Sequence, residues 1–187
     1  LKPPTPQAAI AASEPPLIMA FAYAKQKNPR LKLWIMGPAD EDETYASECF
    51  RLVEDMQIED IVFTGRVQVK DYIGKMDFTI LTSVSEGQPL TILESFAAHR
   101  PVIATDVGNC KGLLLGESDD FGEAGILTHI MNIEEIANAM LTLAANEKMR
   151  HEYGENGYRR LMNKYTIKQM RSTYADIYRE LTKKKTS

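Results

Sequence analysis

The stretch DFTILTSVSEGQPLTILESFAAHRPVIATDVG, residues 77–108, decides the fold. It opens with an apolar run at 77–83, turns through Gly87 and Pro89, continues with apolar residues at helical spacing over 89–98, and ends in a second apolar run at 101–108. Two short strands joined by a helix are the unit from which parallel sheets are built. The stretch therefore predicts two parallel strands with a crossover helix between them.

The same alternation continues on both sides of this stretch. Further strand patterns lie at 31–37, 60–65 and 124–128, and helical patterns lie at 15–28, 41–56, 68–75 and 110–115. Strands that alternate with helices form a parallel sheet covered on both faces. We therefore expect an α/β fold with a Rossmann-like, doubly wound parallel sheet.

The two ends of the chain differ from this pattern. Five of the nine prolines fall within the first sixteen residues, so we expect residues 1–13 to form an arm, a linker or the edge of a truncated domain, and residues 14–187 to form one domain. The last third, from residue 132, predicts C-terminal helices, the last one opened by a capping box of Thr166 and Gln169. An apolar stripe on that last helix is expected to pack against the sheet layer or another domain: Ile167, Met170, Tyr174, Ile177, Tyr178 and Leu181.

Composition excludes several classes of protein. The chain has 187 residues and a net charge of -4, which gives no electrostatic footprint for nucleic acid, and no apolar run approaches the ~20 residues of a membrane span. The two cysteines, Cys49 and Cys110, suggest neither a disulfide framework nor a zinc site. With no signal-peptide pattern at its start, the chain is expected to be cytoplasmic.

In a doubly wound sheet, ligands bind beyond the carboxyl ends of the strands. The most informative loop there is SVSEGQPL, residues 83–90. Pro89 fits the first helical position, which leaves the amides of Leu90 and Thr91 unpaired at the helix start. Gly87 lets a ligand approach the backbone closely, and the helix dipole favours a phosphate there. The loop therefore predicts an anion site.

Two acids flank this helix start, Glu86 before it and Glu94 within it. At roughly 100° per residue, Glu94 falls just off the edge of the apolar stripe of the helix, where a pair of vicinal hydroxyls would suit it. Eight helical residues rise ~12 Å, whereas the two carboxyls of a glycosidase stand roughly 5–9.5 Å apart, so a hydrolase is disfavoured. A nucleotide sugar, with hydroxyls at both ends and phosphates between them, fits this spacing.

The segment EGQPLTILESFAA, followed by RPVIATDVG, resembles the E-x7-E motif of retaining GT-B glycosyltransferases of the glycosyltransferase 4 family. The Gln88-Pro89 pair, with WIMGPADEDETYASEC and VFTGRV, resembles more narrowly the glycosyltransferases of Pel exopolysaccharide synthesis. The resemblance covers roughly residues 20–180, and it implies that the chain is one half of a GT-B fold, the donor-binding half. The acceptor domain would precede it in a longer enzyme, the isolated domain would be inactive, and membrane exopolysaccharide machinery would be a partner.

The resemblance also implies roles for individual residues. Glu86 would be the catalytic residue and contact hydroxyls of the donor hexose, while the segment Gly87, Gln88, Pro89, Leu90 and Thr91 would face the sugar and the diphosphate. Glu94 would hold the ribose hydroxyls, and the backbone of Gly65 and Arg66 would flank the base. The expected donor is UDP-glucose, and enzymes of this kind need no metal. Arg66 could equally be a solvated loop charge.

Three departures from the family stand in the sequence. The Gly-Arg and Lys expected before the helix at 15–28 are absent, His99 stands where the family has glycine, and Gly112 stands where the family has an acid, with Lys111 beside it. Lys111 near a helix start could still meet a phosphate. A structural role is favoured for His99, which tolerates a left-handed backbone better than bulky residues do.

Three functions therefore stay open. The first is the donor-binding domain of a retaining glycosyltransferase that moves a hexose from a UDP-sugar to a growing exopolysaccharide or another acceptor. The second is a non-catalytic module that binds a nucleotide sugar, which the missing basic residues and Gly112 favour. The third is a Rossmann-like interaction domain without a ligand.

Overall fold

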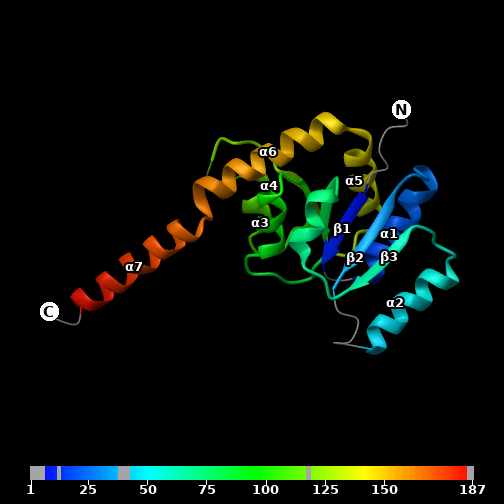
Figure 1. Ribbon diagram of the computed structural model, residues 1–187, viewed down its shortest axis with the longest axis horizontal. Helices are drawn as coiled ribbons and strands as arrows, with labels where there is room; N and C mark the ends of the chain where they lie inside the picture. The colour runs from blue at the N-terminus through cyan, green and yellow to red at the C-terminus, as the bar shows by residue number, and fades with distance from the viewer. Residues whose placement is uncertain (1–6, 12–13, 38–42, 117–118, 185–187) are drawn as a thin grey trace.

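A six-stranded parallel sheet forms the centre of the computed structural model, which describes residues 7–11, 14–37, 43–116 and 119–184 (Figure 1). The strands lie in the order β3-β2-β1-β4-β5-β6, and all neighbouring strands pair in parallel. Their bounds are β1 Gln7–Ala11, β2 Lys32–Met36, β3 Ile61–Gly65, β4 Phe78–Leu81, β5 Val102–Thr105 and β6 Gly125–Thr128. This order confirms the predicted Rossmann-like, doubly wound fold.

Helices cover both faces of the sheet (Figure 1). Apolar side chains of α1, α2 and α5 pack on one face around Phe21, Phe78 and Met140, and those of α3 and α4 pack on the other around Phe96 and Leu113. Because both faces are covered, every residue of β4 and β5 is buried, which explains their continuous apolar runs. The helices are α1 Glu14–Lys27, α2 Glu43–Asp55, α3 Leu90–Ala97, α4 Cys110–Leu115, α5 Ile133–Ala145, α6 Glu147–Lys164 and α7 Ile167–Lys184.

The N-terminal residues correct one prediction. Residues 1–13 were expected to form an arm, a linker or the edge of a truncated domain. No strand was predicted there, but Gln7–Ala11 form β1, the strand on which the sheet order reverses. The alanine-rich sequence carries no strand signal of its own, because alanine has low β propensity. The backbone pairs with β2 along Gln7–Ile10 and with β4 along Ala8–Ala11, so this strand is defined by its two neighbours. Residues 1–6 and 12–13 of the expected arm lie outside the described residues.

The segment that joins β3 to β4 differs from the predicted helix at 68–75. It forms two short 3-10 turns, η1 Val69–Asp71 and η2 Ile73–Lys75, joined at Tyr72, whose φ of -113° departs from a regular helix. Ile73 and the following Met76 are buried, and Met76 packs with Met36 of β2. The connection from β3 to β4 therefore consists of two short 3-10 turns and not of a regular helix that covers one face of the sheet.

A buried charge network ties α6 to the segment that follows α4. The side chain of Arg160 is fully buried, and its Nε and Nη2 atoms each lie 2.9 Å from a carboxylate oxygen of Asp119. The guanidinium also donates to the carbonyl oxygens of Leu113 and Gly122, at 2.8 and 2.5 Å. Because Arg160 donates to Asp119, the pKa of this carboxyl lies well below its ordinary value. The network holds the segment that leads into β6 against α6.

The last helix extends away from the body of the molecule (Figure 1). The predicted capping box is present, since the amide of Gln169 donates to Thr166 Oγ1 at 3.3 Å and the amide of Thr166 donates to Gln169 Oε1 at 2.9 Å. The expected packing of its apolar stripe against the sheet layer is wrong. Its six residues, Ile167, Met170, Tyr174, Ile177, Tyr178 and Leu181, are 47–66% exposed. Packing against another domain stays a prediction.

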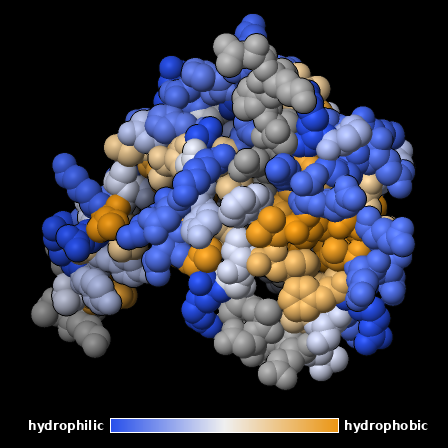
Figure 2. Space-filling view, turned by 45° about the vertical axis from the view of Figure 1, so that its right-hand side comes forward, coloured by the Kyte–Doolittle hydropathy of each residue, from blue (hydrophilic) through white to orange (hydrophobic). Residues whose placement is uncertain are grey.

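The surface of the body is not uniform. Figure 2 shows apolar side chains gathered on the side that carries β3, α1 and α2, beside areas where hydrophilic side chains dominate. Large apolar side chains on these elements are about two-fifths exposed, including Phe50 at 43% and Val62 at 41%. Phe50 also packs edge-on against Phe63 of β3, with ring centroids 4.6 Å apart. This side of the sheet is thus covered by α2 less completely than the centre is covered by α1 and α5.

The buried network predicts a large effect for one substitution. Arg160→Ala leaves Asp119 buried without its main partner, which should lower the free energy of unfolding by about 3–5 kcal/mol. Urea unfolding followed by circular dichroism measures this change. Arg159→Ala, at the exposed neighbouring position, is the matched control and should cost less than about 0.5 kcal/mol. Equal effects of the two substitutions would show that the network does not stabilise the fold.

The lowered pKa of Asp119 gives a second prediction, for pH dependence. The stabilisation from this carboxylate is complete above the unfolded pKa of about 4 and is lost as the pH falls toward the lower folded value. The difference in unfolding free energy between the wild type and Asp119→Asn should therefore be constant from pH 7 to 5 and shrink between pH 4 and 3. Urea unfolding at each pH measures it, and a difference that grows on acidification would contradict the assigned cause.

Candidate functional site

The candidate site lies at the carboxyl ends of the central strands. The sheet order reverses at β1, and doubly wound folds bind their ligands at such a point, in the crevice beyond the carboxyl ends of the two neighbouring strands, here β1 and β4. Pro89 takes the N-cap position of α3, with φ of -70° and an extended ψ of 117°, one residue before the predicted first helical position. Since proline offers no side-chain acceptor, the amides of Leu90 and Thr91 receive no cap from it. The α3 start therefore has no side-chain cap, and the anion site stays a prediction.

The two predicted acids lie on different sides of this helix start. The Glu86 carboxylate is half-buried in the loop and accepts a hydrogen bond of 2.7 Å from the hydroxyl of Ser83, a buried residue. Glu94 is exposed, while Ile92 and Phe96 on the same helix are fully buried. This agrees with the predicted position of Glu94 beside the apolar stripe, from which its carboxylate can reach a ligand.

A hollow of about 280 Å³ lies next to Glu94. It is bounded by α3 on one side and by the 3-10 segment on the other, and its lining residues are Val69, Lys70, Ile73, Glu94, Ala97 and Ala98. Lys70, which was not predicted as a site residue, brings a positive charge to the hollow that holds Glu94. Its apolar walls with one charge of each sign suit a small polar ring with hydroxyls better than an extended apolar ligand.

The loop from β5 to α4 packs directly against the loop that carries Glu86. The amide of Asn109 donates to the carbonyl oxygen of Gly87 at 2.9 Å. Gly108 has a φ of +52°, and a Cβ atom there would stand 2.1 Å from the carbonyl oxygen of Glu86. Lys111 follows in the first turn of α4 and is exposed, so the fold brings it to the same side of the sheet as Glu86.

Gly65 and Arg66 stand at the other end of this edge. Gly65 ends the edge strand β3 with a φ of +65°, and Arg66 is exposed. β3 and β4 are three strand spacings apart in the sheet, so the distance between them is ~14 Å. The fold therefore does not bring Gly65 and Arg66 together with Glu86, but the chain that follows them runs to the hollow beside Glu94.

His99 has a structural setting. Its φ is +54°, so the position is left-handed as the sequence analysis considered. The ring lies 4.0 Å from that of Tyr158, nearly parallel to it, and Nδ1 lies 2.7 Å from Glu155 Oε1. Both partners belong to α6, so His99 ties the end of α3 to that helix.

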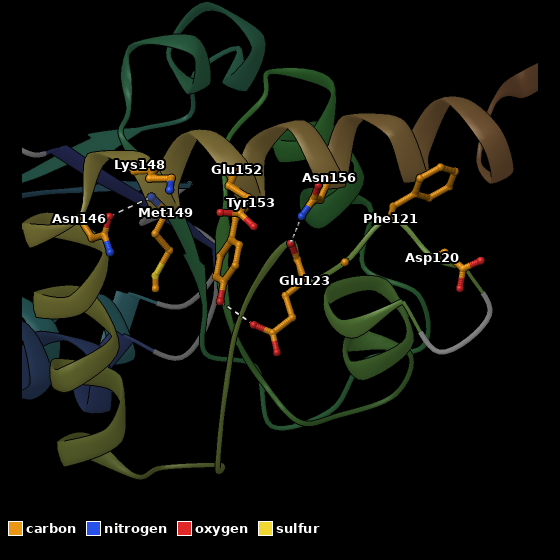
Figure 3. A pocket seen from close by; sticks show the side chains of 10 residues that line it. Asp120, Phe121, Glu123, Asn146, Lys148, Met149, Glu152, Tyr153 and Asn156 are labelled. Carbon is orange, nitrogen blue, oxygen red and sulfur yellow. Dashed lines mark hydrogen bonds between the residues drawn. The ribbon is translucent and has the colours of Figure 1, made fainter.

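A larger hollow lies away from these residues, between α6 and the segment that leads into β6 (Figure 3). Figure 3 shows Tyr153 pointing toward Glu123, to which its hydroxyl donates at 2.5 Å, and Asn156 Nδ2 donates to the carbonyl of Glu123 at 2.8 Å. Burial, and then this hydrogen bond, raise the pKa of Tyr153 to about 12. The hollow lies at the amino end of β6, opposite the crevice, and its polar groups hold this segment to α6.

Two further properties concern membranes and metals. No helix of the described residues has the length and apolar character needed to cross a membrane. Within the same part of the chain, histidine, cysteine and carboxylate side chains form no group of three that could hold a metal ion.

The chain is similar to known glycosyltransferases. Residues 16–146 match the family model of glycosyl transferases group 1. The alpha-monoglucosyldiacylglycerol synthase of Streptococcus pneumoniae is 30% identical over 155 residues, which is 73% of this chain and 34% of that protein. The chain spans about one third of the length of the curated relatives it matches.

Solved structures share the fold. A crystal structure of Anabaena HepE in complex with UDP and glucose superposes with a TM-score of 0.81 at 18% identity, over 94% of this chain and 48% of that one. The C-terminal domain of a glycosyl transferase group 1 family protein from Francisella tularensis gives a TM-score of 0.75 at 23% identity, over 88% of each chain. The chain therefore belongs to the glycosyl transferases group 1 family, with the Rossmann-like fold found in GT-B glycosyltransferases.

Proposed function

We propose that this chain is the donor-binding domain of a retaining glycosyltransferase that moves a hexose from a UDP-sugar, UDP-glucose by preference, to an acceptor. The observation that carries the proposal is the start of α3 at the crevice, with Glu86 before it and Glu94 within it. A helix start suits a diphosphate, and a carboxylate on each side suits the hydroxyls at the two ends of a nucleotide sugar. The complex of Anabaena HepE with UDP and glucose, on the same fold, agrees with this ligand class.

Each site residue has a role in this proposal. Glu86 is the catalytic residue, and its carboxylate accepts from hydroxyls of the hexose. The backbone of Gly87, Gln88, Leu90 and Thr91 provides amides toward the sugar and the diphosphate, and Pro89 fixes their direction at the N-cap. Glu94 accepts from the ribose hydroxyls, Lys111 approaches the diphosphate, and the backbone of Gly65 and Arg66 flanks the base. We expect no metal in this site.

The proposed chemistry follows from where charge develops. The bond between the anomeric carbon and the diphosphate oxygen breaks, a bond to the acceptor oxygen forms on the same face, and the proton of the acceptor hydroxyl passes to an oxygen of the leaving diphosphate. Negative charge therefore grows on the leaving diphosphate, and preoriented amides at the α3 start stabilise that charge without reorganising. Glu86, on the sugar side, fixes the hexose for this step. We assign no residue of this chain as a base for the acceptor hydroxyl.

We also propose an acceptor and partners for the whole enzyme. The Gln88-Pro89 pair inside the motif resembles the glycosyltransferases of Pel exopolysaccharide synthesis, which makes a growing exopolysaccharide the acceptor we propose. The acceptor would bind to a second domain of a longer, cytoplasmic protein, and the membrane machinery that exports the polymer would be the partner of the whole enzyme.

A second candidate function is a module that binds a nucleotide sugar without catalysis. Between β1 and α1 stand only Ala12 and Ser13, followed by Glu14, so this junction has no basic residue for the diphosphate. Gly112 likewise offers no acid in α4. Transfer of glucose from UDP-glucose by the longer protein distinguishes the two functions, because a pure binding module would bind the donor without releasing UDP.

The proposed roles of the two acids predict different ligand dependence. Glu94→Ala should weaken UDP and UDP-glucose about equally, by roughly tenfold, since both carry the ribose and a hydrogen bond to a charged group is worth about 1.5–3 kcal/mol. Glu86→Ala should weaken UDP-glucose by a similar factor and leave UDP unchanged. Calorimetric titration of this chain with UDP, UDP-glucose and GDP measures these affinities.

Two controls make this test decisive. Glu59→Ala, at an exposed position before β3, should change none of the affinities. GDP should bind at least tenfold more weakly than UDP if the base is read as uridine. A folded wild-type sample that binds none of the three ligands would contradict the site, and equal losses of UDP in Glu86→Ala and Glu94→Ala would contradict the division of roles.

A further inference from the structure

Glu86 is held by groups that lie outside the predicted motif. The hydroxyl of Ser83 donates to Glu86 Oε1 at 2.7 Å, and Ser83 itself is only 4% exposed. The carbonyl oxygen of Ser83 in turn accepts a hydrogen bond of 2.5 Å from the hydroxyl of Thr105, a fully buried residue of β5. The position of the Ser83 hydroxyl is thus fixed by the sheet rather than by the exposed part of the loop.

The backbone of Glu86 is held from the opposite side. Gly108 approaches so closely that a Cβ atom there would stand 2.1 Å from the carbonyl oxygen of Glu86 and 2.7 Å from that of Gly87. Its φ of +52° also lies in the left-handed region that glycine adopts without strain. The neighbouring Asn109 amide donates to the Gly87 carbonyl at 2.9 Å, which fixes the distance between the two loops.

We infer that Ser83 and Gly108 are positioning residues for Glu86, and that they act on the sugar part of the donor; this inference rests on the proposed function. The Ser83 hydroxyl orients one carboxylate oxygen, Oε1, and leaves Oε2 for a hexose hydroxyl. Gly108 sets the position of the peptide from which this side chain extends. A flexible glutamate would lose rotamer freedom on binding the sugar, so holding it beforehand increases the affinity for the sugar.

The inference predicts the result of a double-mutant cycle. Ser83→Ala should weaken UDP-glucose about five- to tenfold, because Glu86 is then no longer held in one rotamer and must lose that freedom on binding the sugar, and should leave UDP within a factor of two. In a Glu86→Ala background, Ser83→Ala should have no further effect on the affinity for UDP-glucose, since the carboxylate that the Ser83 hydroxyl orients is gone. Ser85→Ala, at an exposed position of the same loop, is the matched control and should bind both ligands as the wild type does.

Gly108→Ala tests the backbone contact. It should weaken UDP-glucose at least as much as Ser83→Ala does, because the added Cβ displaces the Glu86 peptide. The control is Gly122→Ala, which also places alanine at a positive φ, +87°. Its Cβ atom meets the side chain of Asn156 at 3.0 Å, next to the hollow between α6 and the segment that leads into β6. Thermal unfolding of both variants separates a loss of fold from a loss of binding.

Each outcome decides the inference. Selective loss of UDP-glucose affinity in Ser83→Ala, absent from the Glu86→Ala background, supports it. Wild-type affinity in Ser83→Ala, alongside a selective loss in Glu86→Ala, overturns the inference and leaves the proposed function standing. Equal weakening of UDP and UDP-glucose in Ser83→Ala also overturns it, because the change would then act on the whole loop. If Glu86→Ala has no selective effect, the proposed role of Glu86 fails first.

Discussion

The parallel direction of all six strands is the constraint on which the rest of the structure depends. Each strand must be followed by a crossover before the next can begin at the same side, so all the loops after the strands meet at one edge. The reversal of strand order at β1 sends crossovers to both faces and opens the crevice beside β4. The β4–α3 loop can bring Glu86 and the start of α3, the helix that carries Glu94, to one place because this geometry leaves the loop uncovered.

The second determinant of the site is the contact between neighbouring loops. The β5–α4 loop touches the peptide of Glu86 through Gly108, and the buried ends of β4 and β5 are joined by Thr105 and Ser83. Residues that contact no ligand in the proposed function therefore decide where Glu86 lies. A glycine at a positive φ is needed at only this point of the loop pair, because here two backbones approach within van der Waals contact.

Sequence patterns predict the parts of this fold whose signals are local. The apolar runs at β2 to β6, the Thr166 and Gln169 capping box and the off-stripe position of Glu94 follow from periodicity and capping chemistry, and they are confirmed. β1 was missed because its alanines carry no strand preference and its position depends on pairing with two distant segments. The exposed stripe of α7 shows the same limit, since periodicity identifies an apolar face but not what covers it.

The candidate site was predictable to a similar degree. Glu86, Glu94 and the α3 start follow from spacing along one segment, whereas Ser83, Gly108 and Lys70 become evident only when separate segments are brought together. The Ser83 hydroxyl could have been suspected, since it stands three residues before Glu86 at the end of a strand. Nothing in the local sequence of Lys70 points to Glu94, because their meeting depends on the crossing of the 3-10 segment beside α3.

The distribution of charge bears on what this domain can do in the proposed function. The two residues that stand between β1 and α1 in the sequence, Ala12 and Ser13, carry no positive charge. In the proposed function the leaving diphosphate is therefore stabilised by the α3 amides and Lys111, or by a part of the protein beyond this chain. Amide dipoles already bind the diphosphate in the ground state, so only the part of this interaction that strengthens as charge grows on the leaving group raises the rate of transfer. In the proposed function, donor binding is therefore the part that this chain supplies with its own residues, and transfer would require a second domain to provide the acceptor and the remaining charge.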